Sequence, residues 1–70
     1  MGVNLKRIKA YRIYNEYSQG DMADKMKISL TSYCHKEQGL KDFTSTEVGK
    51  MADIFGVPAG DLFSLEKQLL

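Results

Sequence analysis

Apolar residues recur every three or four positions along most of this 70-residue chain, with polar residues between them. This spacing is the period of an α-helix with one buried face, and no strictly alternating stretch is long enough for a convincing strand. Short connections with turn-forming residues separate the apolar segments. The pattern predicts an all-α fold, a compact bundle of about five short helices that forms one domain over residues 1–70.

The first two predicted helices have clear starts. Asn4 is a good N-cap, and the first helix is expected to run from there to about Asn15. Ser18 caps the second helix, and Asp21 three residues later completes an arrangement similar to a capping box. The predicted buried positions are Met22, Ala23 and Met26 in the second helix and, in the first, Leu5, Ile8 and Tyr11, flanked by Ile13 or Tyr14.

The fourth predicted helix carries the clearest start signal in the chain. Thr44 and Glu47 form a T-x-x-E capping box, and Phe43 before it is placed to staple against Val48. The buried stripe of this helix continues from Val48 through Met51, Ala52 and Phe55, and Gly56 follows as its end. Pro58 suits the first turn of a final helix that contains Leu62, Phe63 and Leu65.

Residues 19–38 contain the most informative arrangement. The second helix and a third one, capped by Ser29 and ended by Gly39, are each about two turns long. A turn of about three residues near Lys27 joins them, and a small residue, Ala23, is available where the helices would touch. This length and spacing are typical of a helix-turn-helix.

The side chains of the third helix fall on two faces. Rotation by about 100° per residue places one group on the side that Tyr33 turns towards the core: Ser29, Ser32, Tyr33 and Lys36. The opposite group is Leu30, Thr31, Cys34, His35 and Gln38. Short, uncharged groups of this kind suit contact with base edges in the major groove, whereas a solvating face is usually rich in Lys and Glu. An inert exposed face is the alternative interpretation.

Charge is unevenly distributed although the net charge is only +1. Residues 1–12 hold basic side chains and no acid: Lys6, Arg7, Lys9 and Arg12. Residues 42–66 hold a single basic residue, Lys50, against five acids: Asp42, Glu47, Asp53, Asp61 and Glu66. The asymmetry predicts one basic and one acidic side, with an evenly mixed surface as the alternative.

Several classes of function are disfavoured. Cys34 is the only cysteine, and no second Cys or His completes a metal site with Cys34 and His35. Adjacent helical residues also point about 100° apart, which argues against a nucleophile pair, so we expect no enzyme activity, metal or cofactor. The apolar face of the first helix is needed for the core, which disfavours membrane binding. We expect a soluble, cytoplasmic protein.

Five segments occur in the order and spacing of a known family: NLKRIKAYR, SQGDMADKMKIS, SYCHKEQG, FTSTE and ADIFGVPAGDLF. From Asn4 to Phe63 the chain resembles the lambda-repressor-like helix-turn-helix domains of the Cro/CI, or xenobiotic-response-element, class. Within that family it is most similar to small phage and prophage regulators of Gram-positive bacteria. The resemblance implies a transcriptional regulator that inserts its third helix in the major groove.

The resemblance also implies residue roles. The family positions that reach base edges are occupied by Leu30, Thr31, Cys34 and His35, and those that bind phosphates by Gln19, Gln38 and Lys41. Arg12 and Glu37 match an ion pair that ties the first helix to the third. The chain departs from the family at Lys27, where glycine is usual, and at Lys36, where an aliphatic residue is common. A lysine at position 27 costs about 1 kcal/mol if its φ is positive.

The partners implied are operator half-sites in double-stranded DNA and a second copy of the chain. Family members generally bind paired half-sites as dimers. We expect weak homodimerisation through an apolar C-terminal end made of Leu62, Phe63, Leu65, Leu69 and Leu70. The alternative function, from a different class, is a small phage modulator that binds another regulator protein rather than DNA alone.

Overall fold

The computed structural model describes residues 2–63. It contains four α-helices and one 3-10 helix, in the order α1 (Leu5–Tyr14), α2 (Gln19–Met26), α3 (Leu30–Gln38), α4 (Ser45–Phe55) and η1 (Ala59–Leu62). The only β-type pairing in this part of the chain is an isolated antiparallel bridge between Val3 and Phe63, which joins its two ends. The all-α prediction is confirmed.

Every α-helix begins at the residue that its sequence signal predicts. Each N-cap side chain accepts a hydrogen bond from a backbone N–H in the first turn, and the four caps are Asn4, Ser18, Ser29 and Thr44. The bond is reciprocated at Ser18 by Asp21 and at Thr44 by Glu47, so both predicted capping boxes are present. These bonds satisfy backbone donors that have no partner within the helix.

A residue with positive φ, in the left-handed region of the backbone, follows each α-helix, directly after α2, α3 and α4 and one residue later after α1. Gly39 and Gly56 occupy this conformation at no steric cost, with φ of 89° and 72°. Glu16 and Lys27 adopt it with φ of 61° and 59°, at a cost of about 1 kcal/mol each because their Cβ atoms crowd the backbone. The strain expected at Lys27 is therefore present.

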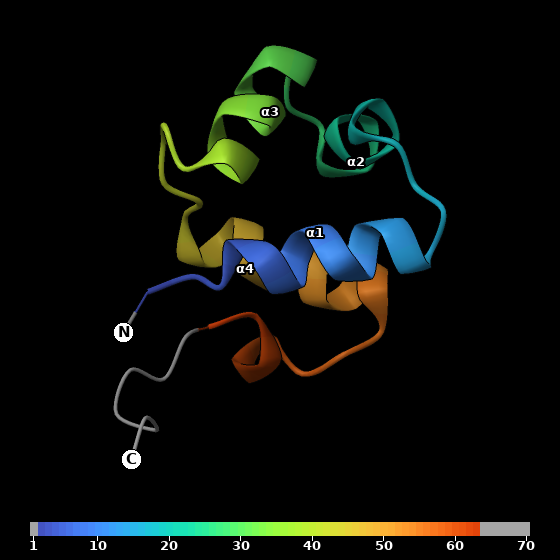
Figure 1. Cartoon of the computed structure of the whole chain (residues 1–70), viewed down its shortest axis with the longest axis vertical. Helices are drawn as coiled ribbons and strands as arrows, with labels where there is room; N and C mark the ends of the chain where they lie inside the picture. Colours follow the sequence, from blue (N-terminus) through green and yellow to red (C-terminus); the bar gives the residue numbers. More distant parts are fainter. Residues whose placement is uncertain (1, 64–70) are drawn as a thin grey trace.

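The core lies between α1, α2, α3 and α4 and is closed below by η1 (Figure 1). Its buried apolar side chains include all the predicted positions of α2 and α4, together with Ile8, Tyr33, Phe43 and Leu62. Aromatic pairs connect distant segments, with Tyr11 and Phe55 ring centroids 5.5 Å apart and those of Tyr33 and Phe43 5.9 Å apart. α2 and α3 form the upper layer in Figure 1, and η1 lies at the opposite end.

Two local predictions need correction. The final element is a single 3-10 turn and not an α-helix in the described residues, and Pro58 precedes it as its N-cap rather than lying in its first turn. Leu62 alone is buried from this turn, so one turn is enough to close the core. Ile13 and Tyr14 were expected to flank the core, but they are 56% and 83% exposed because α1 turns them outward.

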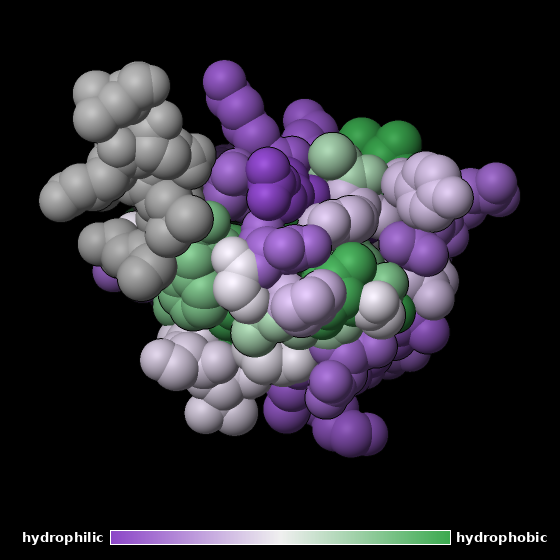
Figure 2. All heavy atoms as spheres, turned by 90° about the horizontal axis from the view of Figure 1, so that it is seen from below, coloured by the Kyte–Doolittle hydropathy of each residue, from purple (hydrophilic) through white to green (hydrophobic). Residues whose placement is uncertain are grey.

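The end of the molecule that carries η1 has a mixed surface. Figure 2 shows it from below, with apolar residues gathered in a band that hydrophilic residues border. Val57 and Phe63, on either side of η1 in the sequence, are half-buried against the core. Of the residues expected to form a dimer contact, Leu62 is fully buried within its own chain and so is not available. Leu65, Leu69 and Leu70 lie outside the described residues.

Candidate nucleic-acid interface

The helices α2 and α3 are joined by residues 27–29 and together cover positions 19–38. Ala23 and Met26 of α2 and Tyr33 of α3 are buried in the shared core, which fixes the two helices against each other. The left-handed backbone of Lys27 makes the turn, and Ser29 then caps α3 by accepting the N–H of Ser32. The arrangement is a helix-turn-helix built from local signals.

The outward side of α3 carries the side chains expected there. Leu30 is 52% exposed, Thr31 and Gln38 are exposed, and Cys34 and His35 are half-buried. None of these is a lysine, arginine or acid. The surface therefore offers hydroxyl, imidazole, amide and methyl groups, which are the groups that contact base edges.

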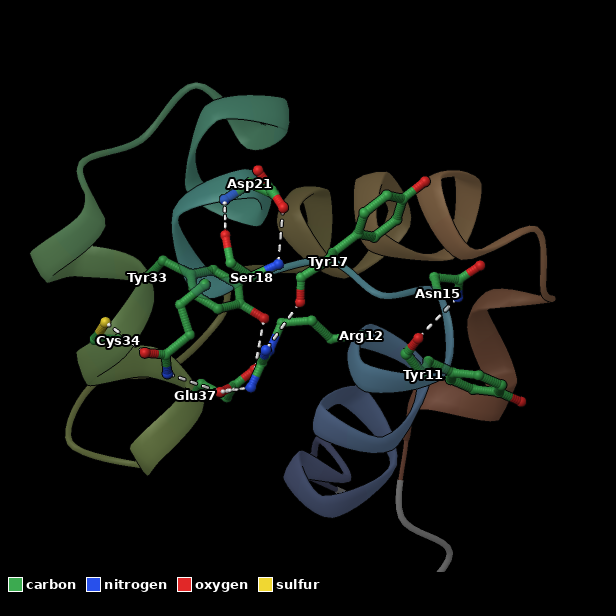
Figure 3. Close-up of polar contacts among 10 residues, drawn as sticks. Tyr11, Arg12, Asn15, Tyr17, Ser18, Asp21, Tyr33, Cys34 and Glu37 are labelled. Atoms are coloured by element: carbon green, nitrogen blue, oxygen red, sulfur yellow. Dashed lines mark hydrogen bonds and ion pairs between the residues drawn. The ribbon is translucent and has the colours of Figure 1, made fainter.

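Behind this surface, the buried carboxylate of Glu37 joins side chains from three segments (Figure 3). Arg12 of α1 donates from Nε to Oε2 at 2.9 Å and from its second guanidinium branch to Oε1 at 3.2 Å. Tyr33 donates its hydroxyl to Oε2 at 2.7 Å, and Gln19 of α2 donates from Nε2 to Oε1 at 2.9 Å. Arg12 also donates to the carbonyl of Tyr17 at 3.0 Å. The structure thus brings Arg12 and Glu37 together as the family resemblance implies.

The protonation of this cluster follows from its contacts. Burial by itself raises the pKa of Glu37, but hydrogen bonds from Arg12, Tyr33 and Gln19 outweigh it and hold that pKa below its usual value. The hydrogen bond to Glu37 raises the pKa of Arg12. Burial and the neighbouring carboxylate raise the pKa of the Tyr33 hydroxyl, so it remains a donor. At neutral pH the cluster is an ionised pair whose carboxylate accepts hydrogen bonds from Arg12, Tyr33 and Gln19.

Gln19 begins α2 and has its side chain held at both ends. Its Nε2 donates to Glu37, while its Oε1 accepts from the thiol of Cys34 at 3.2 Å. An amide nitrogen has two hydrogens, and Glu37 uses one of them. Among the described residues, the backbone N–H groups of Gln19 and Gly20 donate to no acceptor. Cys34 is accordingly turned towards α2 as well as outward, and sequence reasoning missed this contact.

The loop after α3 extends the same side of the molecule. Gln38 and Lys41 are both exposed, and the backbone N–H of Lys41 points at the carbonyl of His35 at 3.4 Å. Leu40 between them is 68% exposed, although an apolar residue at this position after a helix usually packs back on it. The apolar spacing along the sequence does not single out Leu40, but its place directly after Gly39 is a sequence signal that could identify it.

Lys36, at a position where the family it resembles commonly has an aliphatic residue, forms an ion pair with Glu47. Its Nζ contacts both carboxylate oxygens of Glu47, at 2.8 and 2.7 Å. Glu47 also accepts from the backbone N–H of Thr44 in the capping box that opens α4. Hydrogen bonds to Lys36 and Thr44 outweigh the effect of burial and lower the pKa of Glu47. The pair ties α3 to the start of α4 and so helps to fix the intervening loop.

Two further features are absent from residues 2–63. No group of three or more His, Cys, Asp or Glu side chains there is arranged to hold a metal ion. None of the helices described has the length and apolar character that a membrane span requires.

One solved structure resembles the chain over most of its length. The N-terminal DNA-binding domain of SinR from Bacillus subtilis superimposes with a TM-score of 0.73 and 23% sequence identity, over 91% of this chain and 94% of that one. The chain has a helix-turn-helix fold. No family model and no curated protein sequence matches it. At this identity the likeness is one of fold, and a shared fold does not by itself determine function.

Proposed function

We propose that the chain is a sequence-specific DNA-binding transcriptional regulator that inserts α3 in the major groove. The observation that carries the proposal is the outward face of α3, which is uncharged, exposed at Leu30 and Thr31, and held rigidly by the buried Glu37 cluster. The fold is shared with a domain of SinR that binds DNA, which supports the same use here. Leu30, Thr31, Cys34 and His35 would contact base edges.

Phosphate contacts would come from both sides of α3. The N-terminus of α2 offers the free N–H groups of Gln19 and Gly20 and the second amide hydrogen of Gln19. The loop offers the exposed side chains of Gln38 and Lys41. Such contacts set the register of the protein on the duplex but carry no base information.

The test distinguishes contacts to bases from contacts to the phosphate backbone. Preferred sites are first selected from a random duplex pool, and affinity is then measured on the preferred and a scrambled site. Thr31→Ala/His35→Ala should lose about 1–3 kcal/mol per base contact on the preferred site, with little change on the scrambled site. Gln19→Ala should weaken both alike. Neither Thr31 nor His35 is among the buried core residues, so the melting temperature of the double variant should match that of the parent. Equal discrimination by parent and double variant would show that α3 is not the reader.

Salt provides a second, independent criterion. Binding through phosphates releases counterions, so affinity for DNA must fall steeply between low and moderate salt. Binding that is absent at low salt on every selected pool would refute the proposal.

We further propose a phage or prophage regulator of the repressor or Cro type that acts in the host cytoplasm on the nucleoid. The family resemblance of the sequence supports this, and paired half-sites imply a weak homodimer. The apolar band at the end that carries η1 supports association there (Figure 2). Phe63, which follows η1 in the sequence, is half-buried. Sedimentation of the free chain and of its complex with a palindromic site tests this. A 1:1 complex on the palindrome would contradict it.

A modulator that binds another regulator is the second candidate function. The net charge of +1 favours it, because a phosphate-binding surface usually carries a larger positive charge. Affinity for DNA that appears only when a second regulator is added would support this candidate over the first.

A further inference from the structure

Two large apolar residues that are consecutive in the sequence are both exposed at the end of α1. Ile13 is 56% and Tyr14 83% exposed. The other exposed large apolar residues in the described chain are Leu30 on α3 and Leu40 in the loop after it, both on the side of the molecule that is proposed to face DNA. Neither the core nor the DNA proposal uses Ile13 or Tyr14.

These residues belong to a continuous surface that we call the α1 outer face. It consists of Lys6, Arg7, Lys9, Ala10, Ile13 and Tyr14, all of them exposed. Arg12 marks the direction from α1 to α3, because it binds Glu37 there. At about 100° per residue, the outer-face positions are rotated by about 60° to 220° from Arg12. The α1 outer face is therefore turned away from α3.

The charge of this face is entirely positive. No acid precedes Glu16 in the sequence. Lys6 and Lys9 make no hydrogen bond or ion pair with any described residue, while Arg7 reaches the carbonyl of Asp61 at 3.2 Å. Cations in the first turn of a helix oppose its dipole. Helix stability thus does not account for Lys6 and Arg7, and the basic side chains remain available to a ligand.

We propose that the α1 outer face is the docking surface for an acidic amphipathic helix of a partner protein. The apolar stripe of such a helix would cover Ile13 and Tyr14, and carboxylates beside the stripe would meet Lys6 and Lys9. This inference is independent of DNA binding, because it uses a different face of the molecule.

Other occupants fit this surface less well. DNA phosphates would satisfy the lysines but leave Ile13 and Tyr14 without apolar contact, on a face turned away from α3. A second copy would bring the same lysines and no carboxylate to this face, so its positive charge would stay uncompensated. A partner that combines carboxylates with apolar side chains satisfies both properties of the α1 outer face.

The experiment uses a defined probe and isotope-labelled protein. The probe is a synthetic helical peptide with leucines at i, i+3, i+4 and i+7 and glutamates flanking them, and its matched control has lysine in place of glutamate. Amide chemical-shift changes should concentrate on residues 6–14 with the acidic peptide, and Kd should rise with salt. The lysine peptide should not bind. Duplex DNA should shift α3 and the start of α2 instead.

Three variants complete the design. Ile13→Gln/Tyr14→Gln retains helix-forming side chains and should weaken the acidic peptide by about tenfold or more without changing DNA affinity. Lys6→Glu/Lys9→Glu should abolish peptide binding. Leu40→Gln removes an apolar side chain of similar exposure from the other surface and should leave peptide binding unchanged. The proposal is overturned if millimolar acidic peptide shifts no residue of α1, if both peptides bind alike, or if Lys6→Glu/Lys9→Glu impairs DNA binding alone.

Discussion

Removing either partner of the Arg12–Glu37 pair should destabilise the protein strongly. The Glu37 side chain is 3% exposed and that of Arg12 11%, so neither charge is well solvated when its partner is lost. Arg12→Ala leaves a buried carboxylate with two donors, Tyr33 and Gln19, in place of three. Breaking a buried pair from one side costs about 3–5 kcal/mol. A domain of this size is stabilised by only a few kcal/mol, so either single variant is expected at the edge of unfolding.

The assay is a double-mutant cycle in urea. Parent, Arg12→Ala, Glu37→Ala and the double variant are compared, with a stabilising osmolyte present in all four samples so that each retains a folded baseline. Because the second substitution removes a charge that the first has already left unpaired, the double variant should lose far less than the sum of the singles. A coupling free energy of about 2–3 kcal/mol is expected.

A spectroscopic measurement keeps this prediction independent of stability alone. The pKa of Glu37 lies below its usual value in the parent because hydrogen bonds, chiefly from Arg12, outweigh burial. In Arg12→Ala burial should dominate, and the carboxyl carbon resonance of Glu37 should titrate above the ordinary value. Additive losses below about 0.5 kcal/mol, or an unchanged Glu37 titration, would refute the reasoning that the pair is buried and coupled.

Three further predictions concern the scaffold. Lys27→Gly should raise the free energy of unfolding by about 1 kcal/mol in urea melts, because Lys27 has φ of 59°, whereas Lys27→Ala should give no such gain. Lys36→Met should lower the free energy of unfolding by less than about 1 kcal/mol, and Glu47→Met should lower it by about 1–2 kcal/mol, because only the second substitution also breaks a capping box. Equal losses in urea melts of the two variants would contradict this. The free energy of unfolding should fall as pH drops below about 4.5, because the pKa of Glu37 is lowered in the folded protein and its carboxylate takes up a proton on unfolding. It should fall again above about pH 10, because the raised pKa of Tyr33 lets its hydroxyl ionise only in the unfolded chain. Melting temperatures measured across this pH range check both limits.

Much of the fold could be predicted because its determinants are local. N-caps act within three residues, so Ser18 and Thr44 identify their helix starts from sequence alone. Apolar spacing within one helix likewise identifies its buried face, as the buried positions of α2 and α4 show. The helix-turn-helix follows from two such helices at a short separation.

The features that the sequence did not predict correctly are those that contacts between distant segments determine. Ile13 and Tyr14 are apolar, but no segment of the described chain covers their side of α1, because α3 and η1 pack on its other sides. The segment after Pro58 needed only one turn to deliver Leu62 to the core, and its sequence does not distinguish a 3-10 turn from a longer helix. The thiol contact between Cys34 and Gln19 depends on how α2 and α3 cross, which no local pattern encodes.

The Glu37 cluster connects the stability of this domain to the geometry of its proposed interface. Replacing a buried ion pair by apolar residues is often neutral or stabilising, so core stability alone does not explain Arg12 and Glu37. The carboxylate of Glu37, however, also accepts a hydrogen bond from Gln19, the first residue of α2, and another from Tyr33 of α3. One buried group therefore sets the position of the proposed phosphate site relative to α3. Directed hydrogen bonds fix that position, because Gln19 and Tyr33 must each meet an oxygen of the same carboxylate.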